Sequence, residues 1–108
     1  MDIKKEFKDS TLIITLSGKL DTVSSPDLEK ELSLLNDIDN LIFDLKDLNY
    51  VSSAGLRIFL KAMKIMKPKG IMKIINVKPL VKEVFDMTGF SDILNIENVV
   101  GEKWNTIL

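Results

Sequence analysis

The sequence contains no histidine and no cysteine, and these two absences exclude several classes of function. The chain can form neither a Ser-His nor a Cys-His nucleophilic pair, and it cannot build a zinc site from such ligands. Disulfides and thiol redox chemistry are excluded as well. No side chain has an ordinary pKa near neutrality, so acid–base catalysis would need a strongly shifted carboxylate or lysine. We therefore expect a protein that is not an enzyme.

Strong charge of one sign and long apolar runs are also missing. The 15 basic and 16 acidic residues give a net charge of −1, and Arg57 is the only arginine, which disfavours direct contact with nucleic acid. No apolar run reaches the roughly 18 residues of a membrane span, and the charged segment Met1–Lys8 lacks a signal-peptide core. No acidic loop of the Ca²⁺-binding type is present. We expect a cytoplasmic protein without metal or cofactor.

The chain length of 108 residues suits one domain, residues 1–108, and 45% hydrophobic residues are enough for an ordinary core. Two short segments rich in β-forming residues, 3–7 and 12–16, predict an antiparallel hairpin. A helix follows, for which Ser25 is the expected N-cap and Pro26 the first helical residue.

The rest of the chain alternates between strand-like and helix-like segments. The expected elements are a strand at 41–45, a loop at 46–52, a helix at 53–67, a strand at 71–75, a helix from Pro79, a short strand at 93–96 and an amphipathic tail helix with Val100, Trp104 and Ile107. Strands joined through helices should be parallel. The order β-β-α-β-α-β-α-(β)-α predicts an α/β domain with a mixed sheet of four to five strands and about four helices.

The most informative segment is Ser52-Ser53-Ala54-Gly55-Leu56, where a loop meets the helix at 53–67. One of the two serines is expected to be the N-cap, because a serine oxygen accepts a hydrogen bond from an unpaired N–H of the first turn. Gly55 disfavours the helix by about 1 kcal/mol relative to alanine, and it leaves room for another group to approach the backbone. Capping alone is a sufficient explanation of the serines at this point.

Together with the order of the elements, this segment resembles the strand–loop–helix junction of anti-sigma factor antagonists, the bacterial branch of STAS domains. That junction reads Asp-Ser-Ser/Thr-Gly-Leu in the family. The segment Gly18-Lys19-Leu20-Asp21-Thr22 is similar to the family's Gly-x-Leu-Asp segment, and residues 76–90 resemble its late helix, with Gly89-Phe90 after it. The resemblance covers about Ile3 to Ile96.

The resemblance implies a switch protein. In the family, the serine two residues before the glycine accepts phosphate from a serine kinase that is also the anti-sigma factor, and the matching residue is Ser53. The unmodified protein binds this kinase and frees the sigma factor, phosphorylation ends the binding, and a serine phosphatase resets the switch. Ser52 and Ala54 differ from the family pattern, and Ser52 is the alternative acceptor.

The resemblance also implies a partner-binding surface around the junction. The expected contact residues are Asp21, Thr22, Ser52, Ala54, Gly55, Leu56, Arg57 and Ile58. A turn residue that leads into the first helix is an equally good interpretation of Asp21. Ile58 lies at the edge of an apolar arc of roughly 220°, which predicts contact with either a neighbouring helix or a partner protein.

Two other functions are compatible with a domain of this kind. The first is a STAS-type adaptor or scaffold in a transporter or signalling complex, without phosphorylation. The second, a nucleotide-binding domain, is disfavoured because the chain has no Gly-x4-Gly-Lys-Ser/Thr loop. We expect a monomer or a weak dimer.

Overall fold

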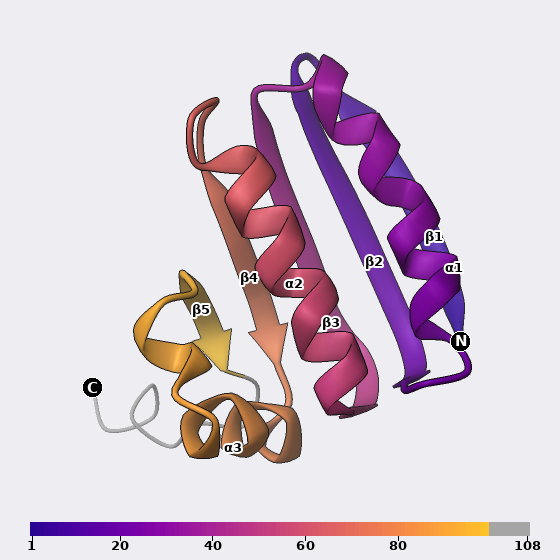
Figure 1. The fold of residues 1–108 in the computed structure, drawn as a ribbon, viewed down its shortest axis with the longest axis vertical. Helices are drawn as coiled ribbons and strands as arrows, with labels where there is room; N and C mark the ends of the chain where they lie inside the picture. The colour runs from indigo at the N-terminus through magenta and orange to yellow at the C-terminus, as the bar shows by residue number, and fades with distance from the viewer. Residues whose placement is uncertain (100–108) are drawn as a thin grey trace.

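The computed structural model describes residues 1–99 (Figure 1). Its strands are β1 (Asp2–Lys8), β2 (Thr11–Leu20), β3 (Asn40–Val51), β4 (Met72–Val77) and β5 (Ile96–Val99). Its α-helices are α1 (Ser25–Lys30), α2 (Ser53–Met66) and α3 (Pro79–Met87), and its 3-10 helices are η1 (Glu31–Asp37) and η2 (Phe90–Asp92). The predicted tail helix with Val100, Trp104 and Ile107 lies outside the described residues.

The five strands form one sheet in the order β1-β2-β3-β4-β5. The first two strands pair as an antiparallel hairpin, and every other neighbouring pair is parallel. Each parallel connection passes through a helix, because parallel neighbours need a long crossover. The predicted α/β class and the predicted mixed sheet are therefore confirmed.

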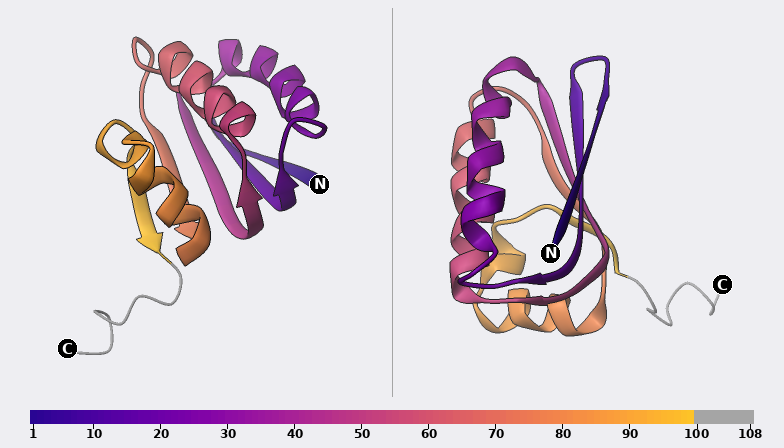
Figure 2. Two further views of the ribbon diagram at one scale, coloured as in Figure 1. Left: turned by 60° about the horizontal axis from the view of Figure 1, so that its bottom comes forward. Right: turned by 90° about the vertical axis from the view of Figure 1, so that its right-hand side faces the viewer.

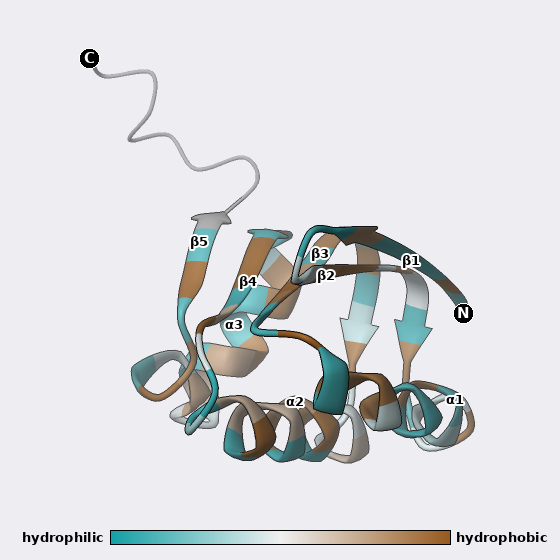
Figure 3. Ribbon diagram, turned by 90° about the horizontal axis from the view of Figure 1, so that it is seen from above, coloured by the Kyte–Doolittle hydropathy of each residue, from teal (hydrophilic) through white to brown (hydrophobic). Residues whose placement is uncertain are grey.

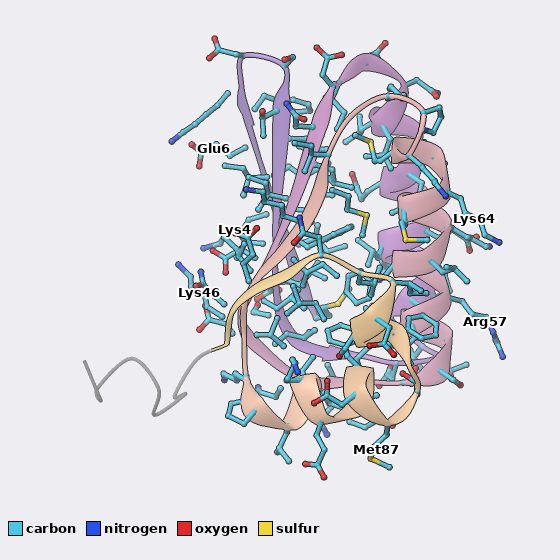
Figure 4. The ribbon with its side chains drawn as sticks, turned by 90° about the vertical axis from the view of Figure 1, so that its left-hand side faces the viewer. Lys4, Glu6, Lys46, Arg57, Lys64 and Met87 are labelled. Atoms are coloured by element: carbon cyan, nitrogen blue, oxygen red, sulfur yellow. The ribbon has the colours of Figure 1, made fainter. Side chains whose placement is uncertain are left out.

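One face of the sheet is not covered by any described helix. Helices α1 and α2 lie side by side on the other face, and α3 lies at the end of the sheet where β3 and β4 finish (Figures 1 and 2). Helices α1 and α2 alternate between hydrophilic and hydrophobic residues, as expected for helices that cover a core with one side (Figure 3). Lys4, Glu6 and Lys46 project from the uncovered face (Figure 4).

Three phenylalanines join the layers of the core. Phe59 of α2 packs edge-to-face against Phe43 of β3, with ring centroids 5.0 Å apart, and against Phe85 of α3 at 5.9 Å. All three side chains are fully buried. Aromatic pairs of this geometry add about 0.5–1.5 kcal/mol each to the stabilisation from burial alone. The cluster therefore fixes α2 relative to both the sheet and α3.

Strand β3 continues to Val51, so the predicted loop at 46–52 is wrong for residues 46–51. The pairing of β3 with β2 shifts register twice, and each shift gives β3 one extra residue. The buried residues in this part of β3 are Leu45, Leu48 and Val51. They are three positions apart, whereas a regular strand with one buried face shows a spacing of two. Because of the two bulges, this part of the sequence lacks the alternating pattern by which a strand is predicted.

Other boundaries also differ from the predicted ones, and β2 extends to Leu20, beyond the predicted strand at 12–16. The N-cap of α1 is Ser24, because the N–H of Ser25 already donates to the Asp21 carbonyl at 2.8 Å as in a helical turn. The last strand starts at Ile96, because the N–H groups of Ile93 and Leu94 donate back to the carbonyl of Phe90 and close a turn there.

Gly70, between α2 and β4, provides a test of this packing. A Cβ on Gly70 would lie 1.9 Å from the carbonyl oxygen of Asp39. Because a backbone carbonyl cannot rotate away as a side chain can, we expect Gly70→Ala to lower the free energy of unfolding by about 3 kcal/mol. The matched control is Gly89→Ala. Gly89 has open space around it and a φ of +80°, so this substitution should lower the free energy of unfolding by only about 1 kcal/mol. Urea unfolding measures both, and equal losses would contradict the close approach.

Candidate functional site

The start of α2 is tied to the end of β2 by the backbone. The N–H of Ser52 donates to the Leu20 carbonyl at 2.9 Å, and the N–H of Leu56 donates to the Ser52 carbonyl at 2.9 Å. Asp21 directly follows Leu20, so the loop between β2 and α1 lies beside the first turn of α2. Two segments that are far apart in the sequence, one containing Leu20 and the other Ser52, thus form one edge of the domain.

The two serines at this edge differ in environment. Ser52 is the N-cap of α2, with extended backbone, and its Oγ accepts a hydrogen bond from the Gly55 N–H at 3.3 Å. Its side chain is half-buried, whereas Ser53, the first residue of α2, is exposed. The prediction that one serine caps the helix is confirmed for Ser52.

Gly55 leaves room for other groups to approach the helix backbone, as predicted, and those groups belong to the core. A Cβ on Gly55 would lie 2.7 Å from Cγ of Leu20 and 3.0 Å from Cγ2 of Val51, and both side chains are buried in the core. The space that the glycine leaves is therefore filled by the sheet, and an outside group cannot use it. Gly55 lets α2 approach β2 and β3 closely.

Asp21 closes the loop between β2 and α1. Its Oδ1 accepts hydrogen bonds from the N–H groups of Val23 and Ser24, both at 3.0 Å, and its own N–H donates to Ser24 Oγ at 2.9 Å. The hydrogen bond from the Ser24 N–H is the main reason that the pKa of the Asp21 carboxyl lies below its ordinary value of 3.8. This geometry supports the interpretation of Asp21 as a turn residue.

A groove of about 200 Å³ lies between α1 and α2 beside this loop. It is lined by Thr22, Ser25, Pro26, Glu29, Ala54, Arg57, Ile58 and Lys61. A salt bridge between Glu29 of α1 and Lys61 of α2 joins the two helices. Four of the predicted partner-binding residues therefore lie in one groove.

The eight predicted contact residues differ in how far they reach the surface. Thr22 and Arg57 are exposed, and Asp21, Ser52 and Ala54 are half-buried. Gly55, Leu56 and Ile58 are buried, and Ile58 is only 4% exposed although it touches the groove. Buried side chains offer a partner almost no area. Of the two expectations for Ile58, the burial favours contact with neighbouring elements of the domain.

Sequence reasoning missed a group of exposed apolar side chains at the same end of the domain. Tyr50, Leu80 and Met87 line a cavity of about 300 Å³ between β3 and α3, and Leu80 and Met87 are 70% and 79% exposed. The sequence of α3 does indicate an exposed apolar side. Leu80 and Met87 lie seven residues apart, on the same side of the helix, and outside the buried side formed by Val81 and Phe85.

Two negative observations concern residues 1–99. No helix in this part of the chain is long and apolar enough to cross a membrane. Over the same residues, no group of three or more acidic side chains could hold a metal ion.

The fold and the junction at Ser52–Leu56 define a small α/β domain of the STAS type. The sequence model of the STAS domain matches residues 2–103, and the chain belongs to this family. The anti-sigma-B factor antagonist of Bacillus subtilis (strain 168) is 33% identical over 98 residues, which cover 89% of this chain and 88% of that protein. The resemblance noted in the sequence is therefore confirmed.

Solved structures share the fold at lower identity. The Bacillus protein SpoIIAA in its phosphorylated form has a TM-score of 0.71 at 19% identity, covering 99% of this chain and all of that one. SpoIIAA in its unphosphorylated form has a TM-score of 0.78 at 20% identity, covering 98% and 96%. A sulfate transporter family protein of Wolinella succinogenes has a TM-score of 0.74 at 12% identity, covering 89% and 83%.

The lowered pKa of Asp21 gives a test of its role in the loop. A carboxyl whose pKa is lower in the folded state stabilises the fold above its ordinary pKa, here 3.8, and loses that contribution as the pH falls through the folded value. We expect Asp21→Asn to be less stable than the wild type at neutral pH, and the difference to shrink below pH 3.8. Thermal unfolding followed across this range checks it. A difference that does not change with pH would show that the charge of Asp21 has no part in holding the loop.

Proposed function

We propose that this protein is an anti-sigma factor antagonist, which binds an anti-sigma factor with serine kinase activity while Ser53 is unmodified and thereby frees a sigma factor. The observation that carries the proposal is the exposed hydroxyl of Ser53 at the start of α2, in a chain with 33% identity to an anti-sigma-B factor antagonist. SpoIIAA, which shares the fold, exists in phosphorylated and unphosphorylated forms. Such a protein acts in the cytoplasm, where transcription takes place.

The environments of the two serines favour Ser53 as the phosphate acceptor. Ser52 Oγ accepts the hydrogen bond from the Gly55 N–H, and a phosphate on Ser52 would disturb a cap worth about 1 kcal/mol. Ser53 is exposed, and no cap depends on its hydroxyl. A kinase could therefore reach Ser53 without unfolding the first turn of α2.

Phosphorylation of Ser53 would act mainly at the interface with the partner. A phosphoserine carries about −1.5 to −2 charges at pH 7, and the positive end of the helix dipole tolerates such a charge at the start of a helix. The fold would thus remain intact, while bulk and negative charge would prevent the partner from binding. The partner would supply the ATP, the metal ion and the base, so this chain needs no catalytic residues. A serine phosphatase would restore the binding form.

Phosphate mapping tests the proposal. The kinase partner is purified by its binding to the immobilised protein and is then incubated with the protein and ATP. We expect phosphate on Ser53 in the wild type and in Ser52→Ala, and none in Ser53→Ala, as measured by mass spectrometry of peptides. Ser52→Ala is the matched control, because it removes the neighbouring hydroxyl. Phosphate on Ser52 alone, on another residue, or on none would contradict the assignment of Ser53.

A STAS-type adaptor that works without phosphorylation is the second candidate. The fold shared with a sulfate transporter family protein favours it. The two functions differ in how binding responds to charge at position 53. A switch protein should bind its partner as Ser53→Ala and bind much more weakly as Ser53→Asp, whereas an adaptor should bind equally well in both forms when ATP is present. Isothermal titration with the purified partner separates them.

A further inference from the structure

Arg57 lies one helical turn after Ser53 on the surface of α2. Residues four apart on a helix have Cβ atoms about 5–6 Å from one another, and long side chains lean towards the start of the helix. Both residues are exposed. Arg57 projects from α2 away from the sheet (Figure 4). Its guanidinium group can therefore cover the turn that begins with Ser53.

Arg57 has no acidic partner among residues 1–99. The six ion pairs in this part of the chain do not include it. Glu29, the acid that lines the same groove, is paired with Lys61. The Asp21 carboxylate accepts hydrogen bonds within its own loop. Within the described part of the chain, its only arginine thus has no counter-ion and lies beside the proposed phosphate acceptor.

We infer that Arg57 binds the phosphate of phosphorylated Ser53 within the same molecule. A guanidinium group donates charge-assisted hydrogen bonds to phosphate oxygens in a fork that fits them well. The orientation is the favourable one, because an acidic group four residues before a basic group stabilises a helix more than the reverse arrangement does. The inference rests on the proposed phosphorylation of Ser53, and it concerns what the phosphate does afterwards.

No other basic residue of α2 lies in such a favourable position to bind a phosphate on Ser53. Lys61 is paired with Glu29 across the groove. Lys64 is 11 residues from Ser53, or about 16 Å along the helix axis, which is beyond direct contact. Lys64 is also exposed, and Figure 4 shows it on the same outer side of α2 as Arg57. It is therefore a suitable control for the effect of positive charge alone.

The ion pair would change what the partner meets at this surface. In the unmodified protein, the guanidinium of Arg57 is available to an acidic group of the partner. After phosphorylation the same group is held against the first turn of α2. The modification would then remove one positive charge from the interface in addition to placing negative charge there.

A phosphate titration tests the ion pair without any kinase. Phosphoserine is incorporated at position 53 during translation, and ³¹P NMR follows the second ionisation of the phosphate, whose ordinary pKa is about 6. A nearby guanidinium favours the dianion and lowers this pKa. We expect Arg57→Gln to raise the phosphate pKa by about 0.5–1 unit, Arg57→Lys to raise it by less, and Lys64→Gln to leave it unchanged.

The outcomes separate the ion pair from its alternatives. Equal shifts in Arg57→Gln and Lys64→Gln would reduce the effect to net charge and overturn the inference, as would no shift in either variant. Because the phosphoserine is incorporated directly, the titration has the same meaning whether or not a kinase modifies Ser53. A failed kinase assay with a positive titration would refute the proposed function and leave the Arg57–phosphate contact standing.

Discussion

The close approach of α2 to the sheet at Gly55 is the constraint on which the rest of the site depends. The absent Cβ lets Leu20 and Val51 pack directly against the helix backbone, and Phe59 is held one turn further on between Phe43 and Phe85. These two contacts fix the position of α2 on the sheet. They leave the cap residue Ser52 half-buried and Ser53, which follows it, exposed to solvent.

The fold could be predicted from the sequence wherever the spacing of apolar residues along the chain matched the side chains that are buried in the structure. Alternation in β2 and the helical spacing in α2 both reflect a single buried side, and a resemblance spread over most of the chain placed them in order. Prediction failed for the second half of β3, because the two bulges depend on how β2 pairs with it. That pairing is a long-range property, and no local period in β3 reveals it.

The sequence motif of the candidate site could be predicted, but the roles and the burial of its individual residues could be predicted only in part. A junction with two serines indicates a cap, but which serine has extended backbone depends on where β3 ends, and β3 ends later than its local pattern suggests. The burial of Ile58 likewise depends on its neighbours in the folded domain. The sequence of α3 places Leu80 and Met87 outside its buried side, yet only the fold brings them close to Tyr50.

The hairpin strand β1 has a consequence for whether two chains can pair edge to edge. It forms one edge of the sheet, and an exposed edge strand can recruit a second chain through its unpaired backbone groups. Lys4, Lys5 and Glu6 lie in the middle of this edge, where charged side chains oppose such pairing. These charges therefore protect the exposed edge of the sheet at β1 against the addition of a strand from a second chain.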